Sequence, residues 1–276
     1  MTGGFDLPLL ERLKRNFIAL SARAPEGAVK DTSLLDHPSF QRILTLVLLI
    51  ELAFAAWVFL VWHRHTAEMA TVTGLHAAHF FVDWTVMMVA MMFPAAALMI
   101  LAFYKAQAVE HADAAFGSTW AFVTAYLLMW AGAGMAAYAG VLIAESAAIH
   151  TTLGHVVAAQ FGAAILLIAG LYQFTPLKEK CLSECRTPLD KTTWHHDTAA
   201  SFRMGLLHGV YCLGCNWLLV AALFPLGMTI GAMAVFTLVI LAEKTLPWPT
   251  SASYTAGVVL VLYGAVLIAS PLLTMH

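Results

Sequence analysis

Residues 43–62 read ILTLVLLIELAFAAWVFLVW, an apolar run interrupted by one carboxylate, Glu51. About 20 such residues in an α-helix cross the roughly 30 Å hydrocarbon core of a bilayer. The whole chain of 276 residues has the same character, because 61% of it is hydrophobic and only 11% is charged. Ordinary soluble domains have about 25% charged residues. The composition therefore excludes a soluble globule and predicts an all-α, polytopic transmembrane helix bundle.

Further apolar segments follow this run, and together they predict about seven spans. The segments lie at residues 43–62, 84–103, 118–143, 154–175, 204–224, 226–242 and 254–273. The fifth ends at Phe224, and only Pro225 separates it from the sixth. These two segments form either a tight hairpin or a re-entrant element that changes the number of spans. Residues 43–276 are thus predicted to be a single transmembrane domain.

The positive charges predict the orientation. With these spans, 13 of the 14 lysines and arginines fall on one side and only Arg64 falls on the other. Cytoplasmic loops retain the excess of positive charge. We therefore expect the N-terminus inside and the C-terminus outside.

Residues 1–42 are predicted to be a basic cytoplasmic segment. Leucines and a phenylalanine recur there at helical spacing beside the basic residues, which is typical of a helix on an anionic membrane surface or of a solvated tail. The segment has no continuous apolar region of the kind that a signal peptide needs. The chain shows neither the basic footprint of a nucleic-acid-binding protein nor the GxxxxGK[ST] motif of a nucleotide site.

The second span begins with candidate metal ligands. His76, His79 and Asp83 are spaced i, i+3 and i+7, so they share one helix face that looks toward Met87. Histidine is a common metal ligand, although interfacial histidines also serve as amphipathic filler.

Four methionines follow on the same span. Thioethers are soft donors that suit Cu(I), but methionine is also a common filler of apolar cores. Pro94 follows them after one intervening residue and frees a backbone carbonyl, which membrane helices tolerate where a cavity or a neighbouring side chain compensates. The four are Met87, Met88, Met91 and Met92.

The fifth span carries the sharpest local pattern. His208, Cys212 and Cys215 lie at i, i+4 and i+7, which places an imidazole and two sulfurs on one helical stripe. A soft metal prefers thiolate and imidazole together. The alternative is that free cysteines pack as small hydrophobic residues.

The predicted inner loop, residues 177–203, supplies a second set of donors. Cys181 and Cys185 would share one side of a helix, so they could hold an ion that passes between the membrane and the cytoplasm. His195 and His196 follow at a spacing that is not that of a standard zinc finger. Copper, as Cu(I), is therefore the expected metal, ahead of zinc.

Two further features of the spans concern packing and charge. Glu51 lies near the middle of the first span and needs a partner, for which His208, Asn216 or a proton are the candidates. It is either a coupling carboxylate or a structural hydrogen-bonding group. Gly132, Ala136 and Gly140 make a ridge of small residues that predicts close helix packing.

Three motifs in a fixed order resemble a bacterial family. They are MMVAMMFP (87–94), YQFTPLKEKCLSECRTP (172–188) and GVYCLGCNW (209–217). Over residues 80–245 the chain is similar to the predicted metal-binding integral membrane proteins, which are copper-associated. The resemblance implies a multi-span bundle in the bacterial cytoplasmic (inner) membrane, with methionine, cysteine and histidine ligands at these positions.

One position departs from the family pattern. The family commonly has a further cysteine after CxGC, and this chain has Asn216 there. The departure predicts a weaker metal site, or a chain that keeps the fold as an accessory subunit.

Three functions remain open at this stage. The residues favour a binding or structural role over an enzymatic one, and no catalytic residue is assigned. The first is Cu(I) handling by transport, chaperoning or metallation of a membrane enzyme, with the lipid bilayer and a copper carrier as partners. The second is a membrane thiol redox protein that uses Cys212 and Cys215. The third is an accessory subunit of a larger membrane complex.

Overall fold

The computed structural model describes residues 37–67, 76–110, 112–149, 154–186 and 198–273. In these ranges the chain forms helices and turns and no strand, which confirms the all-α prediction. The chain divides into Met1–His37 and Pro38–His276, and the described helices belong to the second unit. They are α2 (Pro38–Ala67), α3 (His76–Glu110), α4 (Ala112–Ile149), α5 (Gly154–Tyr172), α6 (Pro176–Arg186), α7 (Thr198–Ala221), α8 (Ile230–Thr245) and α9 (Pro249–Leu273).

Each of the seven predicted apolar segments coincides with its own helix, but not every one has the length of a span. Among the described residues, five helices are long and apolar enough to cross a membrane, namely α2, α3, α4, α7 and α9. The bent pair of α5 and α6 raises this number to six if the pair is one span. Helix α8 has 16 residues and is only about 24 Å long.

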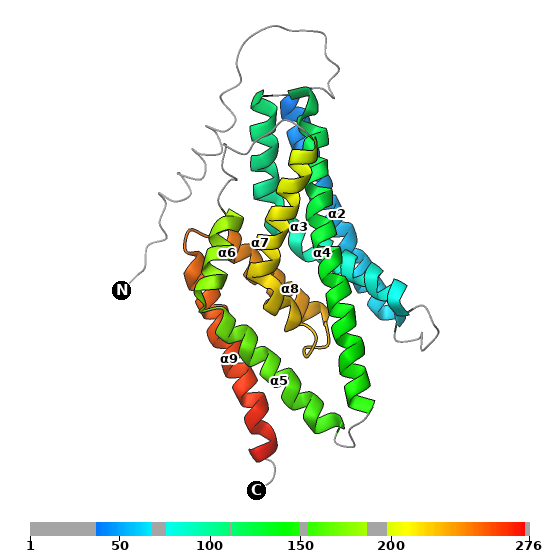
Figure 1. Cartoon of the computed structure of the whole chain (residues 1–276), viewed down its shortest axis with the longest axis vertical. Coiled ribbons are helices and arrows are strands. Elements are labelled where there is room, and N and C mark those ends of the chain that lie inside the picture. Colours follow the sequence, from blue (N-terminus) through cyan, green and yellow to red (C-terminus); the bar gives the residue numbers. More distant parts are fainter. Residues whose placement is uncertain (1–36, 68–75, 111, 150–153, 187–197, 274–276) are drawn as a thin grey trace. The chain divides into compact units, whose positions relative to one another are not determined.

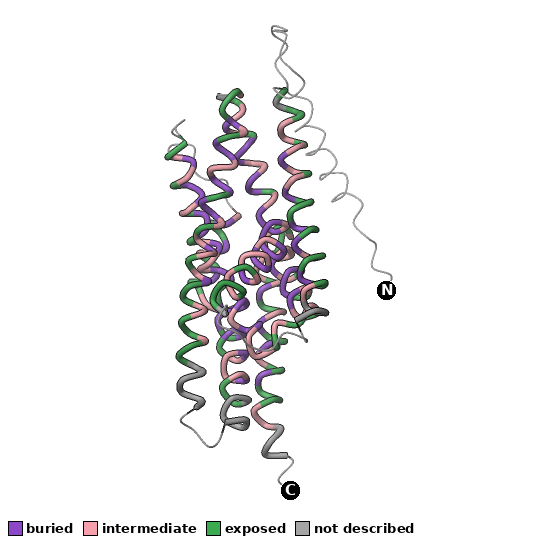
Figure 2. The backbone as a smooth tube through the Cα atoms, turned by 90° about the vertical axis from the view of Figure 1, so that its right-hand side faces the viewer, coloured by how far each residue is buried: buried purple, intermediate pink, exposed green. Residues whose placement is uncertain are grey.

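The helices pack in two groups that share α7 and α8 (Figure 1). Helix α3 packs against α2 and α4, and α7 lies along α4. Helices α5 and α9 form a second close pair, while α8 contacts both α3 and α9. In Figure 2 the buried residues follow the inner faces of the helices and the exposed residues follow the outer faces.

Pro94 shapes the contact between α2 and α3 as the sequence predicts. A proline has no N–H, so the carbonyl of Ala90 loses its partner within the helix. Trp57 of α2 donates its indole N–H to this carbonyl at 3.1 Å. The side chain thus satisfies the freed backbone group and joins the two helices beside the methionines.

Glycines bring α7 close to α4, although not the glycines that the sequence analysis selected. A Cβ atom at Gly205 would overlap the backbone carbonyl of Phe122, and one at Gly209 would lie 2.7 Å from Cβ of Met129. By contrast, Gly132, Ala136 and Gly140 are exposed, and a Cβ at either of these two glycines would meet no atom within 4 Å. The predicted ridge is therefore wrong as a contact of this bundle; the close contact uses GxxxG of α7.

Part of the predicted inner loop is helical. Helix α5 ends at Tyr172, and the chain turns by 65° into α6. Thr175 accepts a hydrogen bond from the backbone N–H of Lys178, and Pro176 occupies the first helical position, both of which favour a helix start. The two loop histidines, His195 and His196, lie outside the described residues, as do residues 1–36.

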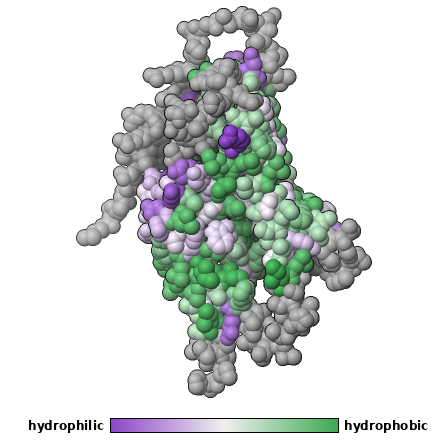
Figure 3. Space-filling view, in the orientation of Figure 1, coloured by the Kyte–Doolittle hydropathy of each residue, from purple (hydrophilic) through white to green (hydrophobic). Residues whose placement is uncertain are grey.

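The surface agrees with the composition. Figure 3 shows apolar side chains over much of the helical surface and a hydrophilic patch on one side. Helix α6 contributes charged side chains to the surface, because Glu179, Lys180 and Glu184 are exposed.

We predict that Gly205→Ala lowers the free energy of unfolding by about 2 kcal/mol or more, because α4 and α7 must separate to admit the methyl group. The matched control is Gly132→Ala, whose methyl group enters open space and adds helix propensity, so its stability should stay equal or rise by about 0.5 kcal/mol. Thermal and denaturant unfolding in detergent measures both. Equal stability of the two variants would contradict the α4–α7 packing.

Candidate metal site

The predicted stripe on α7 faces the interior of the bundle. His208, Cys212 and Cys215 are each at most 1% exposed. All four cysteines of the chain are free thiols. An imidazole and two sulfurs therefore share a dry environment on one helix.

Helix α6 adds a third sulfur to this stripe. The sulfur of Cys185 lies 3.8 Å from that of Cys215. Cys181, one turn earlier, points the same way but abuts Gly214, where an added Cβ would lie 2.8 Å from its sulfur. The CxxxC of α6 thus faces α7, and only its second cysteine joins the sulfur cluster of Cys185, Cys212 and Cys215.

Three polar side chains surround the sulfurs. Asn216 directs its amide nitrogen at Cys215 (3.2 Å) and at Cys212 (3.6 Å). The hydroxyl of Tyr126 on α4 lies 3.1 Å from the Cys212 sulfur, and Lys244 on α8 donates to the same sulfur at 3.0 Å. Four helices, α4, α6, α7 and α8, therefore meet at the sulfur cluster.

Lys244 also brings a basic group to this cluster. Its ammonium donates to the Cys212 sulfur from the last turn of α8, so a positive charge at this position faces the sulfurs.

His208 lies beside the cluster with unused hydrogen-bonding groups. Its ring packs between Phe122 and Tyr126, with centroids 5.6 Å from each. Neither ring nitrogen has a hydrogen-bond partner in the described part of the chain, and the same holds for Oδ1 of Asn216. Buried polar atoms are nearly always paired, so these atoms indicate a missing partner.

A buried ion pair lies next to the cluster. Lys178 of α6 binds Glu243 of α8 at 2.7 Å, and it also donates to the carbonyl oxygen of Cys215 at 2.7 Å. Lys178 and Tyr126 were not predicted as neighbours of the thiols. Lys178 is one of several charged residues in α6, and Tyr126 is one of many aromatic residues, so residue type and spacing single out neither of them.

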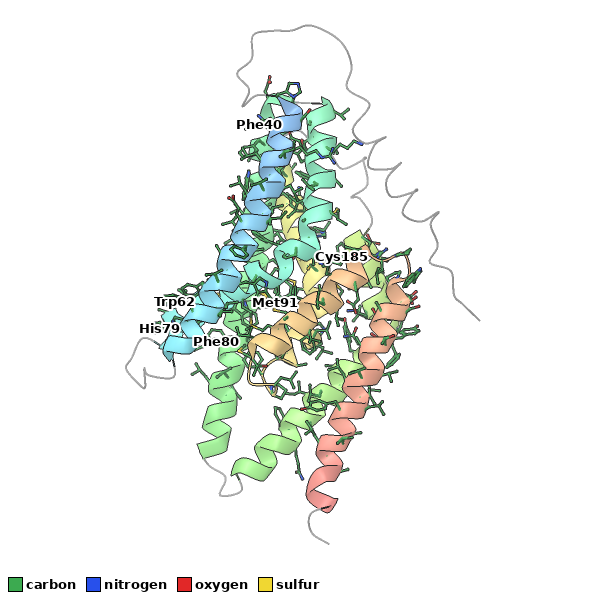
Figure 4. The ribbon with its side chains drawn as sticks, turned by 180° about the vertical axis from the view of Figure 1, so that it is seen from behind. Phe40, Trp62, His79, Phe80, Met91 and Cys185 are labelled. Carbon is green, nitrogen blue, oxygen red and sulfur yellow. The ribbon has the colours of Figure 1, made fainter. Side chains whose placement is uncertain are left out.

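The four methionines are buried in α3, each at most 3% exposed. They belong to the same hydrophobic core as Cys212 and Cys215, but α3 packs chiefly against α2, α4 and α8. Figure 4 shows Met91 inside the bundle and His79 at the end of α3 that lies beside Trp62 of α2.

The start of α3 brings one of its predicted ligands to α2. Asp83 pairs with His63 of α2, with 3.5 Å between the carboxylate oxygen and the ring nitrogen. His79 is exposed, and the side chain of His76 lies outside the described residues. The spacing along α3 did not reveal this partner on α2.

Glu51 is exposed on the outer face of α2, two residues from buried Leu49 and from buried Ala53. The predicted pairing with His208 or Asn216 is wrong, because both lie buried in α7 and their free atoms have no partner. A helical spacing of two residues turns a side chain to the opposite face.

In the parts of the chain that the structure describes, no group of three or more His, Cys, Asp or Glu residues has the geometry of a ready metal site. Two candidate donors nevertheless lie close together, since the sulfurs of Cys185 and Cys215 are 3.8 Å apart.

Comparison with known proteins gives one finding. Residues 81–267 match the family model described as "PpoB2: Copper chaperone". The match covers all the residues of the sulfur cluster and the four methionines. No curated protein and no solved structure gives a significant match.

Proposed function

This chain belongs to the PpoB2 copper chaperone family, and we propose that it is a multi-pass membrane protein that holds Cu(I) between α6 and α7 and passes it on. Cys185 and Cys215 are the proposed primary ligands. Cys212 and His208 are the proposed additional ligands.

The separation of the two sulfurs carries this proposal. Two sulfurs that each lie about 2.3 Å from a shared ion, at a trigonal or tetrahedral angle, are about 3.8 to 4.0 Å apart. Cys185 and Cys215 are 3.8 Å apart without any movement of the helices. The pair therefore has the spacing of two neighbouring ligands.

His208 supports the same assignment. A buried imidazole with two unpaired nitrogens is costly unless a ligand, water or ion binds it. It lies one turn before Cys212 on the same face of α7. A soft ion at the cluster would satisfy one of its nitrogens.

Ligand chemistry favours Cu(I) over zinc. Thiolates are the soft donors that Cu(I) prefers. The ammonium of Lys244, 3.0 Å from the Cys212 sulfur, offsets part of the negative charge that thiolate ligands bring to the site. The description of the matching family also names copper.

The proposed topology puts the site near the cytoplasmic face. We propose seven spans in the bacterial inner membrane, with the N-terminus inside and the C-terminus outside, as the distribution of lysine and arginine predicts. Cys181 of α6, which packs against α7 but is only half-buried, is then the thiol that a cytoplasmic copper carrier meets first. Ligand exchange from Cys181 to Cys185 needs a step of one helical turn.

The methionines and the outer residues extend the same proposal. Met87, Met88, Met91 and Met92 offer a thioether path through the core toward the outer end of α3, where His76, His79 and Asp83 collect or release the ion. The chain has no P-loop, so the ion moves passively or with a proton, or it goes to a membrane enzyme.

A thiol redox activity is the second candidate function. The same 3.8 Å separation lets Cys185 and Cys215 form a disulfide after a small shift, so the pair across two helices replaces the Cys212–Cys215 pair of the sequence analysis. A change in thiol number between cellular redox conditions would favour this function over copper handling.

We predict that the double variant Cys185→Ser/Cys215→Ser, purified in detergent and loaded anaerobically with Cu(I), loses at least about 90% of the copper that the wild type retains after a chelator wash. Serine keeps the size of the side chain but removes the soft ligand. Elemental analysis gives the copper content. The matched control is Cys181→Ser on the same helix, which should retain copper as the wild type does; equal retention in all three proteins would contradict the site.

We predict that Asn216→Cys binds Cu(I) at least about tenfold more tightly than the wild type. Asn216 sits within 3.6 Å of both sulfurs of α7, so a cysteine there adds a thiol at the edge of the sulfur cluster. Competition with a chelator of known affinity measures the change. Asn216→Asp, a hard ligand of similar size, is the control and should give no such gain; weaker binding in Asn216→Cys would contradict the placement of the ion.

A further inference from the structure

Helix α6 is held in place by two cations that flank its cysteines. Lys178 and Arg186 lie eight residues apart, with Cys181 and Cys185 between them. Arg186 donates to the backbone carbonyls of Glu243 and Leu246 at the end of α8, the second at 2.6 Å. An isolated helix of 11 residues is marginal in water, so α6 depends on such contacts.

Lys178 makes the more costly contact. Its side chain is 1% exposed and that of Glu243 is fully buried. Replacement of a buried ion pair by apolar residues of similar size is often neutral or stabilising. The pair therefore has no clear advantage as a source of stability alone.

The pair instead fixes the register of four helices. The Lys178 ammonium on α6 bonds both Glu243 of α8 and the backbone carbonyl of Cys215 on α7. Ser253 of α9 donates to the other carboxylate oxygen of Glu243 at 2.9 Å. Because these bonds are short and directional, they define where α6 lies along α7.

We propose that Lys178 and Glu243 are positioning residues that set the distance between the sulfurs of Cys185 and Cys215. The ammonium of Lys178 donates to the backbone carbonyl of Cys215 itself. Cys185 lies seven residues, or two helical turns, after Lys178 on α6. Any shift of α6 along α7 thus changes the sulfur separation directly. The relevance of this distance to copper rests on the proposed function, but the distance itself does not.

The test measures disulfide formation without any metal. In a Cys181→Ser/Cys212→Ser background, only Cys185 and Cys215 remain, and diamide oxidises them to a disulfide while it takes up their two hydrogen atoms. The rate follows from the loss of alkylatable thiols by mass spectrometry. We expect Lys178→Met to slow the reaction at least about tenfold, whereas Lys180→Met, the exposed lysine on the same helix, leaves it unchanged.

A second variant separates positioning from stability. Lys178→Met/Glu243→Leu removes both charges, so it should recover the thermal stability that the single variant loses. A positioning role predicts that its disulfide formation stays slow, while a merely structural role predicts that stability and rate recover together. If neither variant folds, Ser253→Ala replaces them, since it removes only one hydrogen bond of Glu243; it should slow the reaction a few-fold, and a wild-type rate would overturn the proposal.

The outcomes also separate this inference from the proposed function. Slow oxidation in the lysine variant beside absent copper binding in the wild type would leave the positioning role intact and reject copper handling. Wild-type oxidation rates in a folded Lys178→Met protein would reject the positioning role, whatever the copper content.

Discussion

The ion pair between Lys178 and Glu243 is the interaction on which the arrangement of the candidate site depends. The pair is buried and joins α6 to α8. The ammonium of Lys178 also binds the backbone of Cys215 on α7, and Ser253 of α9 donates to Glu243, so four helices meet at this pair. Without these contacts, α6 would be a short polar helix with few interactions to hold it against an apolar bundle. With them, the sulfur of Cys185 reaches that of Cys215, and Lys244, the residue after Glu243, is placed at Cys212. The proposed ligands and their counter-charge thus share one structural support.

The sequence predicts those features that depend on one helix at a time. Apolar runs of the right length identify each helix that corresponds to a predicted span, and residue spacing identifies the buried stripe of α7. The consequence of Pro94 is also local, because its missing N–H leaves the carbonyl of Ala90 without a partner within the helix. In the structure, the indole N–H of Trp57 donates to this carbonyl. The match of the family model agrees with the motifs that carried the resemblance, and it confirms the association with copper.

Features that depend on which helix faces meet could not be predicted in this way. Glycines occur on both faces of α4 and α7, and only the packing shows that Gly205 and Gly209 lie at the contact. A carboxylate near the middle of a span predicts an internal partner for Glu51, yet its side chain is exposed on α2. The sequence pairs Cys212 with Cys215 because they are close in the chain, whereas the short sulfur–sulfur separation in the structure joins Cys215 to Cys185 of another helix. The role of Asn216 also becomes clear only in the structure, where its amide nitrogen contacts the sulfurs of Cys212 and Cys215 at the position where the family pattern has a thiol.

In the proposed function the bound copper ion rests on the cysteines of α6 and α7 and not on the methionines of α3. X-ray absorption at the copper edge distinguishes these two ligand sets on Cu(I)-loaded protein in which every methionine is replaced by selenomethionine, because selenium marks the methionines and sulfur marks the cysteines. We predict copper–sulfur scattering at about 2.3 Å, the length of a metal–thiolate bond, and no copper–selenium contact. A copper–selenium contact without sulfur, or a shell of nitrogen and oxygen alone, would contradict the account.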